Sequence, residues 1–235
     1  MHVAEREQLA AMNTPARAVS SLMGPLYFDA EGDAIRPIYI ARAKDGHITP
    51  ATRQLRLVKD PELISTLRAQ GENIIDLGDR LLQIVQVVYT GIHLNKLHAI
   101  DEKARTFQAD FDLWFRYSGE LDTENIVFPN AVTPLRLAKP LVARELLGEQ
   151  YRAFRVQGTF RYTTTHRNLI DGNEDFMIQF RHAHLYHSRL VFVTDSRNMG
   201  LSKGRSGWGR ILRAEQVLAA DSGWVIRDAT VYQEI

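Results

Sequence analysis

Apolar and polar residues alternate strictly in the middle of the chain, as they do in a strand with one buried face. Between residues 106 and 117 the regularly spaced apolar side chains are those of Phe107, Ala109, Phe111, Leu113, Phe115 and Tyr117. The positions between them hold Gln108, Asp110, Asp112, Trp114 and Arg116. Successive side chains of a strand point to opposite faces of a sheet. We therefore expect Asp112, Trp114 and Arg116 to point away from the core.

Further runs of the same kind follow along the chain. They alternate with a period of two or are rich in β-branched and aromatic residues, and they span residues 84–95, 153–163, 176–180, 190–195 and 224–234. Several short strands separated by turn residues predict antiparallel sheets that pack face to face. The expected fold is therefore mainly β, an immunoglobulin-like antiparallel β-sandwich.

The first 83 residues are less regular and predict a small α/β segment. Residues 1–14 have a helical pattern that ends before Pro15, and short strands are expected between residues 24 and 58. A second helix is predicted from Asp60, which can cap it, to Gly71. The expected organisation is an N-terminal segment at 1–58, a helical connector at 59–83 and a β domain at 84–235.

Composition and charge exclude several classes of function. The chain has 235 residues with 29 Lys and Arg against 28 Asp and Glu, so it lacks the basic excess of a nucleic-acid-binding domain. It has no cysteine, which removes disulfides, thiolate metal sites and cysteine nucleophiles. No run of about 18 apolar residues is present to span a membrane. The first 13 residues contain no apolar core of a signal peptide.

A set of motifs then carries a family resemblance. In order along the chain they are the Thr-Gly-Ile at 90–92, the acidic pair at 101–102, LWFRY at 113–117, FRVQGTFRYTTT at 154–165, NEDFMIQFRH at 173–182 and GWVIRDATVYQE at 223–234. Their order and spacing resemble the extracellular ligand-binding domain of bacterial pentameric ligand-gated ion channels, the Cys-loop receptor family. The resemblance covers roughly 150 residues of the chain.

A second resemblance concerns the N-terminal segment. The stretch GPLYFDAEGDAIRPIYIARAKDG at 24–46 is similar to the last part of type I periplasmic solute-binding proteins of ABC transporters. It implies that residues 1–58 are the tail of a solute-binding domain joined to a channel-type ligand-binding domain.

The sequence also departs from the channel family. The aromatic-proline tip of the family is not recognisable at 165–175, which leaves the coupling role of that loop unsupported. The sequence stops at Ile235, where the hairpin with the flexible binding loop is expected to begin, and it contains no membrane helices. We therefore expect a ligand-binding part that conducts no ions by itself.

The resemblance implies a non-enzymatic, extracytoplasmic recognition module of a channel-like receptor. Such a receptor binds a small molecule between subunits of a homopentamer, at the periplasmic or extracellular face of a bacterial membrane. Its partners are copies of itself and a membrane domain that this chain lacks, and no cofactor and no nucleic acid are expected. The alternative is a periplasmic solute-binding component of an amino-acid or urea ABC transporter, in which the sandwich serves as a docking appendage.

The ligand contacts implied by the resemblance lie on outward strand positions and one loop. They are Asp112, Trp114, Arg116, Arg161 and Trp208. An exposed indole between an acid and an arginine offers a stacking surface and both signs of charge. In the alternative interpretation a neighbouring loop covers Trp114, and Arg116 forms an ion pair with an acid. The glycines of the 200–210 segment indicate a mobile loop, which the side chain of Trp208 anchors.

No catalytic site and no metal site are predicted. His182 and His184 stand two residues apart on an expected strand, a spacing at which two imidazoles can chelate zinc. A third ligand is not identifiable, so solvated histidines or histidines at the edge of the core are the favoured interpretation. No serine occupies a nucleophile elbow, and we expect a protein that is not an enzyme.

Overall fold

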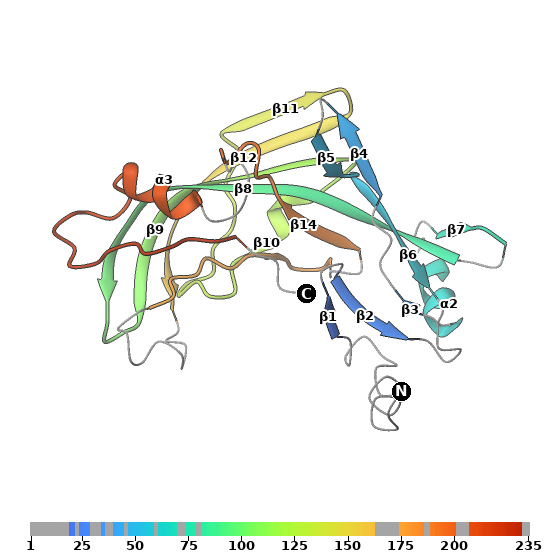
Figure 1. Ribbon diagram of the computed structural model, residues 1–235, viewed down its shortest axis with the longest axis horizontal. Coiled ribbons are helices and arrows are strands. Elements are labelled where there is room, and N and C mark those ends of the chain that lie inside the picture. Colours follow the sequence, from blue (N-terminus) through green and yellow to red (C-terminus); the bar gives the residue numbers. More distant parts are fainter. Residues whose placement is uncertain are drawn as a thin grey trace, which may run out of the picture. The chain divides into compact units, whose positions relative to one another are not determined.

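The structure is a computed structural model with two compact units, residues 1–85 and 86–235. It describes residues 19–21, 24–28, 34–35, 40–44, 47–58, 61–69, 74–78, 81–162, 174–185, 189–200 and 207–231. Strands dominate both units, and the described strand pairs with a defined register are antiparallel with one exception (Figure 1). The prediction of a mainly β protein with antiparallel sheets is therefore confirmed.

The first unit consists of short pieces. Its strands are β1 (Val19–Ser21), β2 (Gly24–Phe28), β3 (Ala34–Ile35), β4 (Ala41–Lys44), β5 (His47–Pro50), β6 (Arg53–Val58) and β7 (Ile74–Asp76). The first three form one antiparallel sheet, and β4 and β5 form a hairpin. The second predicted helix is confirmed as α2 (Pro61–Ala69), which buries Leu67. The helix predicted at 1–14 lies outside the described residues.

Five neighbouring strands form the centre of the second unit. They are β11 (Val142–Leu146), β12 (Glu149–Arg161), β9 (Thr106–Ser118), β8 (Leu81–Asp101) and β14 (Leu190–Thr194), in this spatial order. The β8–β9 hairpin turns at residues 102–105. The predicted strands at 84–95, 106–117, 153–163 and 190–195 are therefore present. The exception to antiparallel pairing is β14, which runs parallel to β8 with Leu190 opposite Gln86.

One face of this sheet is the hydrophobic core, and it is the face that the alternation predicts. Phe107, Phe111 and Phe115 of β9 are completely buried there, and Phe154 and Phe160 of β12 pack against them. Neighbouring rings lie about 6 Å apart in tilted or edge-on arrangements, which aromatic pairs prefer. The aromatic alternation of β9 and β12 therefore holds the sheet to the layer beneath it.

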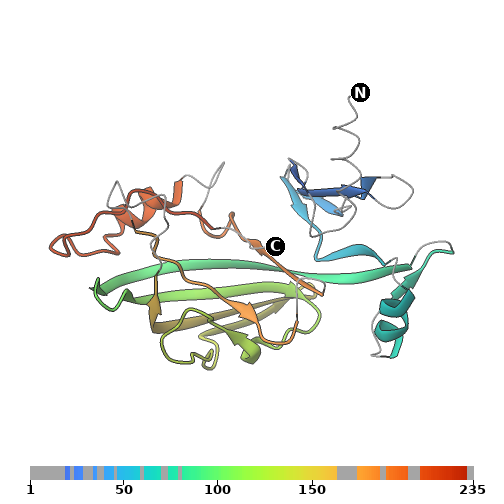
Figure 2. The same cartoon turned by 90° about the horizontal axis from the view of Figure 1, so that it is seen from below.

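Among the described residues, the layer over this core is largely irregular. It contains the 3₁₀ turn η2 (Thr123–Asn125), the small pair of β10 (Ile126–Val127) with β13 (Arg181–His182), and the extended segment 174–180. In Figure 2 the yellow-green segment around η2 and β10 lies on one side of the green strands, and the orange-red segment with α3 (Trp208–Ala214) lies on the other. A second full sheet, and with it the sandwich in the strict sense, stays a prediction.

The segment predicted as a strand at 176–180 has no strand hydrogen bonding, so that part of the prediction is wrong. The prediction of which side chains face the core is correct. Phe176, Ile178 and Phe180 all pack against the core, as alternation requires, yet only residues 181–182 belong to a strand. The side chain of Asn130 takes the place of a partner strand. Its Nδ2 donates to the carbonyl oxygen of Met177 at 2.7 Å, and its Oδ1 accepts from the N–H of Gln179 at 3.1 Å.

The strand predicted at 224–234 is also wrong for its described part, because residues 224–231 have no regular structure. Arg213 of α3 donates through Nη1 to the carbonyl oxygens of Ile226 and Arg227, at 2.7 and 2.8 Å. The Trp224 ring meets Phe176 edge-on at 5.3 Å. A helix side chain and the aromatic core thus hold this segment in place of a strand ladder.

The role of Asn130 is testable by replacing it. We expect Asn130→Ala to lower the free energy of unfolding by about 2 kcal/mol, because the backbone of residues 177 and 179 loses two partly buried hydrogen bonds. Urea denaturation followed by circular dichroism measures the change. Asn95→Ala is the control, since the Asn95 amide makes only a local contact of 3.4 Å to the His93 carbonyl oxygen. Equal stability of the two variants would contradict this role.

Candidate functional site

Trp114 points to the face away from the core, as predicted, but the prediction that its indole is exposed is wrong. The residue is only 7% exposed. Its ring lies across Gly91, where the position of an added Cβ would overlap the indole atoms. Met199, Trp208 and Ile211 pack around it from the far side. The indole is therefore covered, as in the alternative interpretation of the sequence.

A buried carboxylate, Asp195, fixes the polar edge of this indole. Asp195 follows the last residue of β14 and is 2% exposed. Its Oδ2 accepts from Trp114 Nε1 at 3.2 Å and from Asn198 Nδ2 at 2.6 Å. Its backbone N–H donates to the carbonyl oxygen of Thr90 at 2.8 Å, which continues the parallel pairing of β14 with β8. The carboxylate therefore joins the outer face of the sheet to the turn that follows β14.

The guanidinium group of Arg116 contacts two acidic side chains and one aromatic ring. Its Nη1 donates to Glu149 Oε2 at 3.2 Å and its Nη2 to Asp195 Oδ1 at 3.5 Å. The guanidinium carbon lies 4.2 Å from the centre of the Tyr89 ring, a cation–π geometry. The side chain is 24% exposed. This arrangement also agrees with the alternative interpretation of the sequence, in which Arg116 forms an ion pair with an acid.

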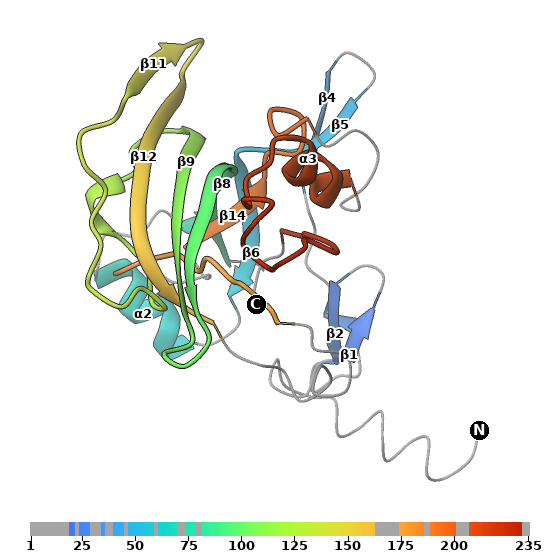
Figure 3. The same ribbon diagram turned by 90° about the vertical axis from the view of Figure 1, so that its left-hand side faces the viewer.

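Trp208 joins the same cluster but not as part of a loop. Among the residues that the structure describes in the 200–210 segment, Trp208 begins the helix α3, and its side chain packs against both Trp114 and the main core. Figure 3 shows α3 beside β8 on the side of the sheet away from β11. The fold thus brings Trp208 to the cluster of Trp114, from which it is far apart in sequence, while Arg116 lies two residues from Trp114 on the same strand. Contact of these residues with a ligand stays a prediction.

Asp112 and Arg161 lie elsewhere on the outer face. Asp112 stands directly opposite Arg155 of β12 and accepts from its Nη1 at 3.1 Å. The same guanidinium reaches Asp110, which also accepts from Gln157 Nε2 at 2.9 Å. Burial alone would raise the pKa of Asp110, but the hydrogen bonds from Gln157 and Arg155 outweigh it and hold the pKa below its usual 3.8. Arg161 is exposed at the end of β12.

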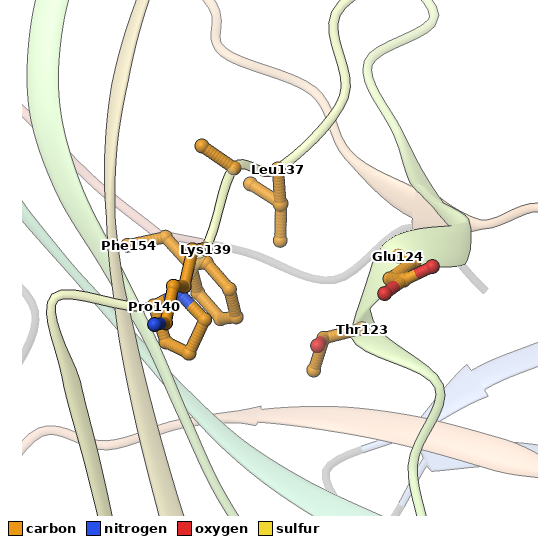
Figure 4. A pocket seen from close by; sticks show the side chains of 7 residues that line it. Thr123, Glu124, Leu137, Lys139, Pro140 and Phe154 are labelled. Carbon is orange, nitrogen blue, oxygen red and sulfur yellow. The ribbon is translucent and has the colours of Figure 1, made fainter.

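An open pocket of about 290 Å³ lies on the other side of the sheet, and none of its residues was predicted as a site. It is lined by Thr123, Glu124, Leu137, Ala138, Lys139, Pro140 and Phe154. Figure 4 shows Thr123 and Glu124 along one wall, with Leu137, Lys139, Pro140 and the Phe154 ring on the opposite side. A carboxylate and an ammonium group therefore stand on opposite sides of a space that has both polar and apolar lining.

Local hydrogen bonds position both walls. Asp122 caps η2, since its Oδ1 accepts from the N–H of Glu124 at 3.0 Å and its Oδ2 from Asn125 Nδ2 at 2.6 Å. The opposite wall is anchored where the N–H of Leu141 donates to the carbonyl oxygen of Ala153 at 2.8 Å, next to Phe154. The Asp-Thr-Glu-Asn run at 122–125 is a capping signal in the sequence, but it does not indicate what the turn faces.

The two histidines do not form a metal site with each other. His182 is buried, and both of its ring nitrogens are engaged by the backbone at 3.0–3.2 Å, while His184 is exposed. Within the described part of the chain, no group of three or more potential ligands is arranged to hold a metal ion. The favoured interpretation of His182 as a histidine of the core edge agrees with this geometry.

Comparison with models of protein families gives no match. Comparison with curated proteins gives no significant match. Within the described segments, no helix combines the length and apolar character needed to cross a bilayer. What the chain does is therefore inferred from its own residues.

The fit of Trp114 over Gly91 is testable. We expect Gly91→Ala to lower the free energy of unfolding by about 1–3 kcal/mol, because the new methyl group overlaps the indole and displaces it from Asp195. Chemical denaturation followed by tryptophan fluorescence measures both the stability and the indole environment. Gly207→Ala is the control, since a Cβ there meets nothing within 4 Å. Unchanged fluorescence and stability in Gly91→Ala would refute the close packing.

Proposed function

We propose that the second unit recognises a small molecule without transforming it, and that the pocket between η2 and Phe154 is its binding site. The observation that supports the proposal is that Glu124 and Lys139 stand on opposite walls of a pocket whose lining is both polar and apolar. Small-molecule sites are concave and mainly apolar, with a few polar groups that orient the ligand. The volume of about 290 Å³ stands at the lower end of such sites and suits a ligand of modest size.

The chemistry of the walls favours an ω-amino acid as the class of ligand. Its ammonium group pairs with Glu124 and its carboxylate with Lys139, and its methylene chain lies against the half-buried Pro140. Exposed ion pairs contribute only about 0–1 kcal/mol each, so the methylenes supply most of the affinity. Binding should therefore tighten as the spacer between the two charges lengthens.

We expect binding affinity to rise from glycine through 4-aminobutyrate to 6-aminohexanoate, as measured by isothermal titration calorimetry. Glu124→Gln and Lys139→Ala should each weaken binding of the tightest member about threefold to fivefold, the equivalent of one exposed ion pair. Glu102→Gln and Lys103→Ala change the same charges at the β8–β9 turn and serve as matched controls. A series without dependence on spacer length, or controls that weaken binding equally, would contradict the proposed pocket.

We further propose that this recognition belongs to an extracytoplasmic receptor of the pentameric channel type in a bacterial membrane. The supporting observations are the order of the resembling motifs along β8, β9 and β12 and the mainly β structure that carries them. Copies of the chain and a separate membrane domain are the partners that this function requires. The outer-face residues Asp112 and Arg161 are then candidates for contacts between copies.

Self-association is measurable directly. Light scattering over a concentration series should show the mass rising from one chain of 26.8 kDa toward five chains. Charge reversal at an exposed outer-face position, Arg161→Glu, should reduce the association, whereas Lys103→Glu at the β8–β9 turn should leave it unchanged. A chain that stays monomeric at every concentration would show that it does not assemble by itself.

A further inference from the structure

His182 holds the pocket wall through hydrogen bonds that require one protonation state. The residue is 5% exposed, and its Nδ1 accepts the backbone N–H groups of His184 at 3.2 Å and Leu185 at 3.0 Å. An imidazole nitrogen that accepts two N–H groups carries no proton. The single proton of the neutral ring is therefore on Nε2, which donates it to the carbonyl oxygen of Asp122 at 3.1 Å.

This ring connects two segments that are 60 residues apart in sequence. His182 belongs to β13 and lies opposite Ile126 of β10. The next residue, Ala183, donates its N–H to the carbonyl oxygen of Asn125 at 2.7 Å. Asp122, the acceptor of the Nε2 proton, is the residue that caps η2, and the next two residues of the turn form the pocket wall. The histidine thus clamps this wall to β13.

Protonation removes the basis of the clamp. A proton on Nδ1 turns an acceptor into a donor that faces two other donors, so the N–H groups of His184 and Leu185 lose their partner. The ring would also carry a charge in a buried position, which is unfavourable unless it is compensated. Resting on the proposed function of the pocket, we propose that protonation of His182 releases the wall formed by Thr123 and Glu124 and thereby empties the ligand site in mildly acidic solution.

The surroundings of the His182 ring shift its pKa in both directions. Burial is the largest effect and lowers the pKa of His182 below its usual 6.5, and the nearby His184 lowers it slightly further. The hydrogen bond to the Asp122 carbonyl and the Asp122 carboxylate raise it. Arg181 on the same strand and Glu124 of η2 are exposed to solvent.

The direction of the pH effect follows from the lowered pKa. The unfolded chain takes up the proton more readily than the folded one, so the clamp contributes its full stability above about pH 6.5. That contribution is lost as the pH falls from there through the lower pKa of the folded state. The wall is therefore closed at neutral pH and opens in acid.

Hydrogen exchange in the ligand-free full chain tests the clamp independently of any ligand. After correction for the intrinsic pH dependence of exchange, the protection of residues 122–127 should fall about tenfold between pH 7.5 and pH 5.0. His182→Asn keeps an acceptor near the position of Nδ1 and cannot be protonated in this range, so its protection should not change with pH. The control His184→Asn removes an exposed imidazole and should behave as the unmodified protein does.

Two further measurements make every outcome decisive. Nitrogen NMR of the unmodified protein reports whether His182 carries its proton on Nε2 and whether its titration coincides with the loss of protection, even if His182→Asn does not fold. Calorimetry with 6-aminohexanoate at both pH values should show at least fivefold weaker binding at pH 5.0. Protection that is independent of pH, or that changes equally in His182→Asn, overturns the clamp. Intact clamp behaviour without binding of 6-aminohexanoate at either pH overturns the ligand site instead.

Discussion

The arrangement of the second unit depends on one buried carboxylate. Asp195 lies at the end of β14, and a charge at this depth is tolerated only with hydrogen-bond donors around it. Trp114 and Arg116 of β9 supply donors from the sheet, and Asn198 supplies one from the turn beyond. These donors come from separate segments. The hydrogen bonds to one carboxylate therefore hold together β14, the outer face of the sheet and the turn that follows β14. The outer face is consequently a closed, internally paired surface at its Trp114 end.

The alternation of residues is sufficient to predict β9 and β12, since their apolar faces are the core faces observed. Alternation does not reveal which residues pack against the opposite face. Alternation therefore places Trp114 on the correct face, but its cover includes a helix that begins about 94 residues later and whose seven residues carry no recognisable start signal. The strand predicted at 176–180 is wrong for a related reason, because the side chain of Asn130 bonds the backbone of residues 177 and 179 where a strand partner was expected.

The candidate pocket was beyond sequence prediction because both of its walls are irregular. Apart from Phe154 of β12, its residues come from a 3₁₀ turn and a coil segment, where neither periodicity nor propensity specifies the direction of a side chain. The two walls differ in how they are held. The wall with Lys139 is anchored by a backbone hydrogen bond to β12, which does not titrate. The wall with Glu124 has a backbone hydrogen bond from Ala183 to Asn125 and, in addition, the hydrogen bonds of the His182 imidazole. The titratable imidazole makes this side of the site the sensitive one.

The parallel pairing of β14 with β8 has a consequence for the order of folding. Leu190 meets Gln86 across about a hundred intervening residues, whereas β8 and β9 are joined by a tight turn at 102–105. Closing so long a loop carries a larger entropic cost than forming a hairpin, and contacts between residues distant in sequence slow folding. We therefore expect the β8–β9–β12 sheet with its aromatic face to form early, and β14 to dock as a late step. Since Asp195 arrives with β14, burial of the Trp114 indole reports the completion of folding rather than its beginning.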